Sequence, residues 1–182
     1  ILSGLVGSEM CIRDSSKSNH ISDSSYDENK RWPDGLSPFG FKVVKEMNKQ
    51  GVMIDISHVS DAAFMKVLEL SKAPVVATHS SLRHFTPGWE RNVSDEMLIA
   101  LAENGGVIQL CFGSDFVANR KDNPDIEVSV KNVVDHIDRV RDLVGIDHVG
   151  FGSDFDGEVP LPEDINDAVS YTHLTLPTNR EV

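Results

Sequence analysis

Between about Lys30 and Ala168, apolar positions alternate between two kinds of spacing. Short continuous apolar runs predict strands at 52–57, 74–78, 107–112 and 148–153. In the segments that separate these runs, apolar residues recur every three or four positions, which predicts helices. Apolar strands that alternate with helices indicate a parallel sheet covered by helices.

The ends of the predicted helices are marked by capping residues. Ser37 followed by Pro38 predicts the start of the first helix, and Gly51 predicts its end. Ser60 and Ser94 are the predicted N-caps of the next two helices. The longest helix ends before glycine, and its spaced apolar positions are Val130, Val133, Val134, Ile137, Val140 and Val144.

A parallel sheet of this kind can be a doubly wound open sheet or a (β/α)8 barrel. No glycine-rich phosphate-binding sequence follows any predicted strand, which weakens a nucleotide-binding open sheet. Polar residues cluster after the carboxyl ends of several strands, where barrel active sites are built. We therefore expect an α/β fold that forms a partial (β/α)8 TIM barrel of about four βα units, since a whole barrel takes about 250 residues.

The two ends of the chain differ from its middle. The Ser/Asn/Asp-rich stretch 15–25 predicts loop or disorder, and no regular period continues after Ser170. The terminal strings ILSGLVGSEMCIRDS and VSYTHLTLPTNREV also resemble read-through of sequencing adapters. We expect residues 1–29 and 170–182 to be non-native or disordered, with genuine flexible termini as the alternative, and residues 30–169 to hold the fold. His20 and His173 are therefore discounted as ligands.

Composition and charge narrow the functional classes. Hydrophobic residues make up 40% and charged residues 25% of the 182 positions, which fits a globular protein. No apolar run approaches the roughly 18 residues of a membrane span. The net charge of −12 argues against binding to nucleic acid or to an anionic membrane, since both need a basic face. Of the two cysteines, Cys111 is expected to pack as a small hydrophobe, and no disulfide with Cys11 is assigned.

Two histidines stand where apolar runs stop. His58 follows Ile54 and Ile56 at period two and shares their face, and His79 ends the next run in the same way. Neutral imidazoles at equivalent ends of neighbouring strands suit zinc. Taken singly, each is typical of a strand-end histidine bonded to backbone. The pair, together with Asp154 at a third strand end, favours a metal site.

Other polar residues near these strand ends are candidates for further roles. Asp154 is the aspartate of SDFDG expected to point into the site, as a ligand or as the group that takes a proton from metal-bound water. Asp156 fits a turn. Asp55 alternates to the face opposite His58, which predicts a supporting or helix-facing role. Arg91 can bind a carboxylate through its planar guanidinium, although its spacing alone also fits a surface arginine.

With these residues in hand, the middle of the chain resembles the membrane (renal) dipeptidase family, peptidase family M19. The resemblance covers about residues 31–168 and rests on five segments in order: DGLSPFG, GVMIDISHVSD, PVVATHSS, RNVSDEM and GIDHVGFGSDFDG. It implies a (β/α)8 barrel, a binuclear zinc centre and hydrolysis of dipeptides, often with tolerance of a D-residue at the C-terminal position.

The resemblance also implies roles for individual residues. His58 and His79 resemble the histidines that bind the second zinc, Asp154 the acid/base near the bridging water, and Arg91 the arginine that holds the substrate's free carboxylate. The family's His-x-Asp pair for the first zinc and its bridging glutamate are absent from this sequence. We therefore expect at most one partial zinc site and an inactive fragment. A half barrel has two unpaired sheet edges, which favour aggregation or a homodimer.

Two alternative functions stay open. Other amidohydrolase-type metal hydrolases also use strand-end histidines and a late aspartate, although RNVSDEM and DISHVSD argue against this class. The other alternative is a non-catalytic half barrel that associates with another chain. The preferred dipeptide, the cellular compartment and any membrane anchor are not predicted by this sequence.

Overall fold

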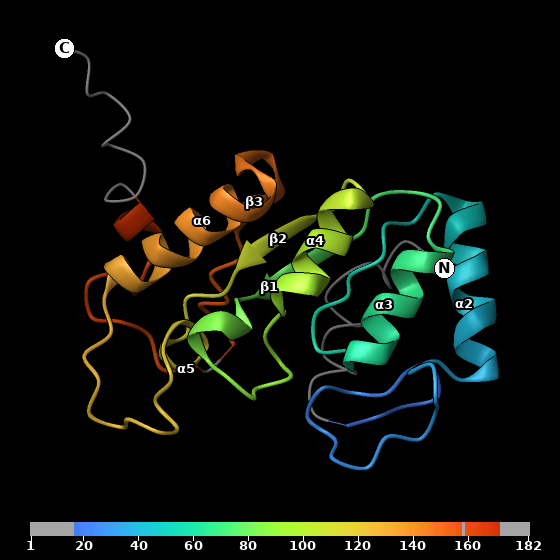
Figure 1. Cartoon of the computed structure of the whole chain (residues 1–182), viewed down its shortest axis with the longest axis horizontal. Helices are drawn as coiled ribbons and strands as arrows, with labels where there is room; N and C mark the ends of the chain where they lie inside the picture. The colour runs from blue at the N-terminus through green and yellow to red at the C-terminus, as the bar shows by residue number, and fades with distance from the viewer. Residues whose placement is uncertain (1–16, 158, 172–182) are drawn as a thin grey trace.

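The computed structural model describes residues 17–157 and 159–171, whose arrangement is shown in Figure 1. The predicted alternation of helices and strands is confirmed. The helices are α2 (Pro38–Gln50), α3 (Asp61–Leu70), α4 (Asp95–Glu103), α5 (Ser114–Val117) and α6 (Val130–Val144). The strands are β1 (Val76–Ser80), β2 (Val107–Leu110) and β3 (Val149–Phe151), and three 3-10 turns lie at Arg83–Phe85, Ile146–His148 and Ala168–Tyr171.

The three strands form one parallel sheet in the order β1-β2-β3. Val76 of β1 lies opposite Val107 of β2, and Ile108 of β2 lies opposite Val149 of β3. The chain thus has a partial α/β fold with parallel strands. Phe151 on the outer strand β3 is 39% exposed, so within the described residues the sheet is open at this edge.

The predicted strand at 52–57 is present only as a bridge. Asp55 pairs in parallel with Val76, and Val76 exchanges backbone hydrogen bonds with Ile54 and Ile56 at 3.0 and 2.8 Å. The extended segment ends at once because His58 adopts a left-handed backbone conformation with φ 66°. The prediction of a regular strand here is therefore wrong, but the segment still lies beside β1.

The main helices begin and end where the sequence predicts. Ser37, Ser60 and Ser94 cap α2, α3 and α4, and each side-chain oxygen accepts a backbone N–H from the first turn. Gly51 ends α2 at φ 68°, and Gly145 follows α6. These helices lie side by side in chain order along the molecule (Figure 1), with α4 packed on β2 and α6 on β3. No helix of the described ranges is long and apolar enough to cross a membrane.

The core lies between the helices and the sheet. Its largest fully buried side chains come from α3, α4, the strands and the segments that follow them, and they include Phe64, Leu98, Leu101, Ile108, Leu110 and Phe112. Cys111 is also fully buried, as expected of a small hydrophobe. The core therefore fixes the strand ends at which the candidate residues lie.

Residues 17–36 form a loop that packs against the start of α3. Asp23 is fully buried, and its carboxylate accepts the backbone N–H groups of Arg31 and Trp32 at 2.9–3.0 Å. Its backbone oxygen accepts the N–H of Ser60 at 2.9 Å. The predicted loop is confirmed from residue 17 onward, but it is ordered because these bonds satisfy a buried carboxylate.

Several expectations for the ends fall outside the described residues. They concern residues 1–16 and 172–182, with Cys11 and His173 among them. The division into foreign ends and a middle at 30–169 stays a prediction.

Candidate active site

The imidazoles of His58 and His79 meet at the rim of the sheet. Their Nε2 atoms lie 2.6 Å apart and their ring centroids 4.7 Å apart. His79 belongs to β1, and His58 directly follows the segment that is bridged to β1. The structure thus brings together the two residues that the spacing singles out, and their role as metal ligands stays a prediction.

Both rings are held in the neutral form. Burial, followed by the charges of Arg91 and His79, lowers the pKa of His58 to about 2. Burial and Arg91 also lower the pKa of His79, against the opposing charges of Asp154 and Asp55. Neutral imidazole is the form that coordinates a metal, so the environment suits this chemistry.

Arg91 points into the site and is only 3% exposed. Its Nη2 donates to the backbone oxygen of His79 at 2.6 Å, and its Nη1 donates to Ser80 Oγ at 2.7 Å. The same Nη2 lies 3.2 Å from His58 Nε2, and the guanidinium stacks 5.0 Å from the ring centre of Phe116. Arg91 Nε is buried without a hydrogen-bond partner among the described residues. Arg91 is therefore not a surface arginine.

Asp154 follows β3 and shares an unusual backbone conformation with His58. Within the described residues these two are the only non-glycine positions with positive φ, at 58° and 66°. Such conformations cost on the order of 1–3 kcal/mol and cluster at functional sites. A turn bond from Gly157 N to Asp154 O at 3.0 Å holds the segment, which fits the turn expected there. The charge of the Asp154 carboxylate partly opposes the lowering of the His79 pKa, and Asp154 Oδ2 lies 4.0 Å from Cys111 Sγ.

Tyr26 is a residue of this site that the sequence analysis missed. Its ring centre lies 5.8 Å from that of His58, and the backbone N–H of Ser25 donates to His58 O at 2.8 Å. Burial raises the pKa of the Tyr26 hydroxyl, against the charge and hydrogen bonding of Arg91. No hydrophobic period marks this polar loop, so sequence pattern alone carries no signal for it.

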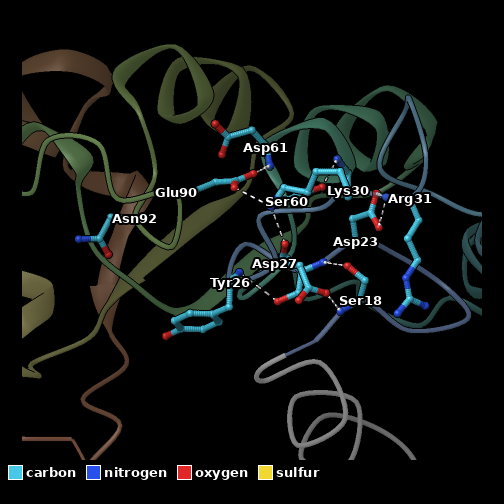
Figure 2. A network of polar contacts seen from close by, with 12 residues as sticks. Ser18, Asp23, Tyr26, Asp27, Lys30, Arg31, Ser60, Asp61, Glu90 and Asn92 are labelled. Atoms are coloured by element: carbon cyan, nitrogen blue, oxygen red, sulfur yellow. Dashed lines mark hydrogen bonds and ion pairs between the residues drawn. The ribbon is translucent and has the colours of Figure 1, made fainter.

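A polar network joins this loop to the segment that carries Arg91 (Figure 2). Lys30 Nζ lies 2.6 Å from Glu90 Oε2, and Glu90 Oε1 accepts the backbone N–H of Asp61 at 3.0 Å. The Asp61 carboxylate in turn receives two hydrogen bonds from Arg83, at 2.7 and 2.6 Å. The residue before Arg91 is thus tied to the start of α3.

Two other histidines serve the fold. His136 on α6 is fully buried, where its Nδ1 accepts the N–H of Leu82 at 3.1 Å and its Nε2 lies 3.3 Å from Val117 O. His148 Nδ1 lies 2.8 Å from Gly106 O, at the end of β3 remote from Asp154.

The nitrogen pair fits part of a zinc site. Zinc takes three or four protein ligands, whereas the described residues contain no group of three His, Cys, Asp or Glu that could hold a metal. Two nitrogens on one tetrahedral zinc lie about 3.3 Å apart, since each bond is about 2.0 Å long. His58 and His79 would need to separate slightly from 2.6 Å to share an ion.

Comparison with known proteins adds a family and relatives. The model of the family described as membrane dipeptidase (Peptidase family M19) matches residues 13–180. An uncharacterized dipeptidase of Schizosaccharomyces pombe is 42% identical over 140 residues, which cover 77% of this chain and 33% of that protein. The chain thus spans about a third of this curated relative.

Solved structures extend the comparison to the fold. A metallo peptidase from Rhodobacter sphaeroides, liganded with a phosphinate mimic of the dipeptide L-Ala-D-Ala, is 36% identical with a TM-score of 0.71, over 80% of this chain and 40% of that chain. Dipeptidase AC, a metallo peptidase of family M19, is 34% identical with a TM-score of 0.71, over 82% of this chain and 43% of that chain.

Proposed function

The chain belongs to the membrane dipeptidase family, peptidase family M19, and on this basis we propose that it is part of a zinc-dependent dipeptidase that hydrolyses dipeptides to free amino acids. The observation that carries the proposal is the meeting of His58 and His79 beside Arg91 at one rim of a parallel sheet. In the longer protein we propose that the sheet closes into a (β/α)8 barrel, of which residues 30–169 are the C-terminal part.

His58 and His79 are the residues that would hold zinc in this chain. When bound, zinc polarises the scissile carbonyl and lowers the pKa of water. The two imidazoles are suited to this role because burial lowers the pKa of both. Two ligands are an incomplete set, so we propose that the 182 residues alone are inactive.

Arg91 and Asp154 would act on the substrate. The free carboxylate of a dipeptide is an anion that a guanidinium binds well, and Arg91 Nε lacks a partner within the described part of the chain. Asp154, which lies near His79, would pass a proton from the attacking water to the leaving amine. The dipeptide mimic bound by the Rhodobacter sphaeroides relative supports a dipeptide as the substrate class.

A transplant experiment tests the proposed function. Residues 30–169 replace the equivalent segment of the Rhodobacter sphaeroides metallo peptidase, and the chimera and the 182-residue chain are assayed with zinc on L-Ala-D-Ala and on N-acetyl-alanine. We expect the chimera to hydrolyse the dipeptide and the chain alone to do nothing. Hydrolysis of N-acetyl-alanine alone would instead support an amidohydrolase-type enzyme. A folded, zinc-loaded chimera without activity would support a non-catalytic role.

A further inference from the structure

We propose that Asp55 is a positioning residue which, acting through the hydroxyl of Thr78, holds the imidazole of His79 in the tautomer with its proton on Nδ1. His79 Nε2 is then unprotonated and accepts the proton of His58 Nε2, which lies 2.6 Å away. This inference deepens the proposed function, because an unprotonated Nε2 is what a metal requires. The tautomer itself is a property of this chain that can be measured without any metal.

The Asp55 carboxylate is fixed by three hydrogen bonds from two segments. Its Oδ1 accepts the backbone N–H groups of Ser57 and Thr78 at 2.9 and 3.1 Å. Its Oδ2 accepts the Thr78 hydroxyl at 2.6 Å. Because both oxygens are engaged from different directions, the carboxylate has one orientation, and Oδ2 is the atom that faces Thr78 Oγ1.

The Thr78 hydroxyl determines which ring nitrogen of His79 carries the proton. A hydroxyl has a single proton, and here Thr78 donates it to Asp55. In its 2.8 Å contact with His79 Nδ1, the hydroxyl oxygen can therefore only accept, so Nδ1 must carry a proton. A neutral imidazole has one N–H, which leaves Nε2 without one. Ser57 Oγ does not compete, because it lies 3.5 Å from Thr78 Oγ1, beyond the usual range of such a bond.

His58 and His79 differ in the hydrogen bonding of their Nδ1 atoms. His79 Nδ1 contacts Thr78 Oγ1, whereas His58 Nδ1 is buried without a hydrogen-bond partner among the described residues. Metal-binding histidines are usually oriented by a hydrogen bond from the second ring nitrogen, and loss of that partner typically weakens metal binding 10–100-fold. Asp55 therefore acts on His79, through Thr78, and not on His58.

Substitution of Asp55 gives a sharp expectation. In Asp55→Asn, the amide oxygen must take the Oδ1 position, because two backbone N–H groups point at it. The amide nitrogen then faces Thr78 Oγ1 and donates to it, which frees the hydroxyl proton to be donated to His79 Nδ1. His79 should switch to the tautomer with its proton on Nε2. Thr78→Ser keeps the hydroxyl and should keep the original tautomer. Thr78→Val removes the hydroxyl and so breaks the Asp55–Thr78–His79 relay, the chain of hydrogen bonds that joins the three side chains.

Nitrogen-15 NMR of the imidazole rings in the metal-free full chain reads the tautomer directly. We expect the unsubstituted chain and Thr78→Ser to show a protonated Nδ1 and an unprotonated Nε2 at His79. Asp55→Asn should show the reverse, and Thr78→Val a mixture. A protonated Nε2 in the unsubstituted chain would overturn the proposal without any variant. The same tautomer in Thr78→Val as in Thr78→Ser would also overturn it.

Zinc affinity, measured by competition with a chromophoric chelator, separates this inference from the proposed function. We expect Asp55→Asn to bind zinc about 10–100-fold more weakly than Thr78→Ser. An unsubstituted chain with the expected tautomer but no zinc binding would contradict the metal site and leave the Asp55 relay supported. Equal zinc affinity of Asp55→Asn and Thr78→Ser would show that the relay has no influence on the metal.

Discussion

The Nε2 atoms of His58 and His79 lie 2.6 Å apart, although 21 positions separate the residues in the sequence. The parallel bridge between Asp55 and Val76 places the two rings side by side at one end of the sheet. At this distance one of the two nitrogens carries the shared proton and the other accepts it, since two unprotonated nitrogens would present only lone pairs to each other. Zinc, if bound by both rings, would have to displace this proton.

Removal of either ring should weaken zinc binding. We expect His58→Ala and His79→Ala each to lower the affinity of the chain for zinc at least about 10-fold, because each deletes one of two converging donors. His148→Ala is the matched control, since its ring contacts Gly106 O elsewhere in the fold. Chelator competition measures all three, and unchanged affinity in His58→Ala would refute the ligand assignment.

Arg91 should discriminate substrates by their free carboxylate. In the chimera proposed above, we expect Arg91→Ala to raise the KM for L-Ala-D-Ala by about 10- to 100-fold, since a charge-assisted hydrogen bond contributes about 1.5–3 kcal/mol. The KM for the corresponding dipeptide amide should not change. Steady-state kinetics on both substrates provide the check. An equal rise in KM for the amide would mean that Arg91 does not bind the substrate's carboxylate.

His136 should make the fold sensitive to acid. Burial lowers the pKa of His136 to about 4, below the value of about 6.5 of an unfolded histidine. Protonation therefore favours the unfolded chain. The contribution of neutral His136 to the free energy of unfolding is complete above pH 6.5 and is lost as the pH falls from 6.5 to 4. The loss amounts to at most about 3 kcal/mol.

The variant His136→Gln isolates this contribution. A glutamine amide can accept from Leu82 N and donate to Val117 O, as the imidazole does, but it does not titrate. Urea unfolding at several pH values between 7 and 4 should show a shallower decline of the unfolding free energy in the variant. Parallel pH profiles for the two proteins would exclude His136 as the acid-sensitive group.

Two glycines with the same backbone conformation should respond differently to alanine. Gly35 and Gly51 have φ of 69° and 68°, but a Cβ on Gly35 would lie 2.1 Å from the backbone nitrogen of Ala63, whereas a Cβ on Gly51 meets nothing within 4 Å. We expect Gly51→Ala to cost about 1 kcal/mol of unfolding free energy. Gly35→Ala should cost at least about 2 kcal/mol more, because loop and helix must separate. Similar urea midpoints for the two variants would contradict the packing of the loop on α3.

Local chemistry in the sequence determined the helix boundaries and the choice of candidate residues. Ser37 and Gly51 mark the ends of α2 because a cap is satisfied by its own first turn and a left-handed stop favours glycine. Period-two spacing likewise singled out His58 and His79, since alternation along an extended segment is independent of the rest of the fold.

Only the tertiary structure decided how these residues are held. The segment at 52–57 is a bridge and not a regular strand, since strand formation depends on a partner and His58 turns the chain away. The sequence pattern predicts loop or disorder around Asp23. It does not reveal the order of this loop, because the N–H groups that bind the Asp23 carboxylate belong to residues eight and nine positions later. The neutrality of His58 and the burial of Arg91 come from elements far apart in the chain. Burial and hydrogen-bond geometry arise from such long-range packing, which a pattern along one sequence does not contain.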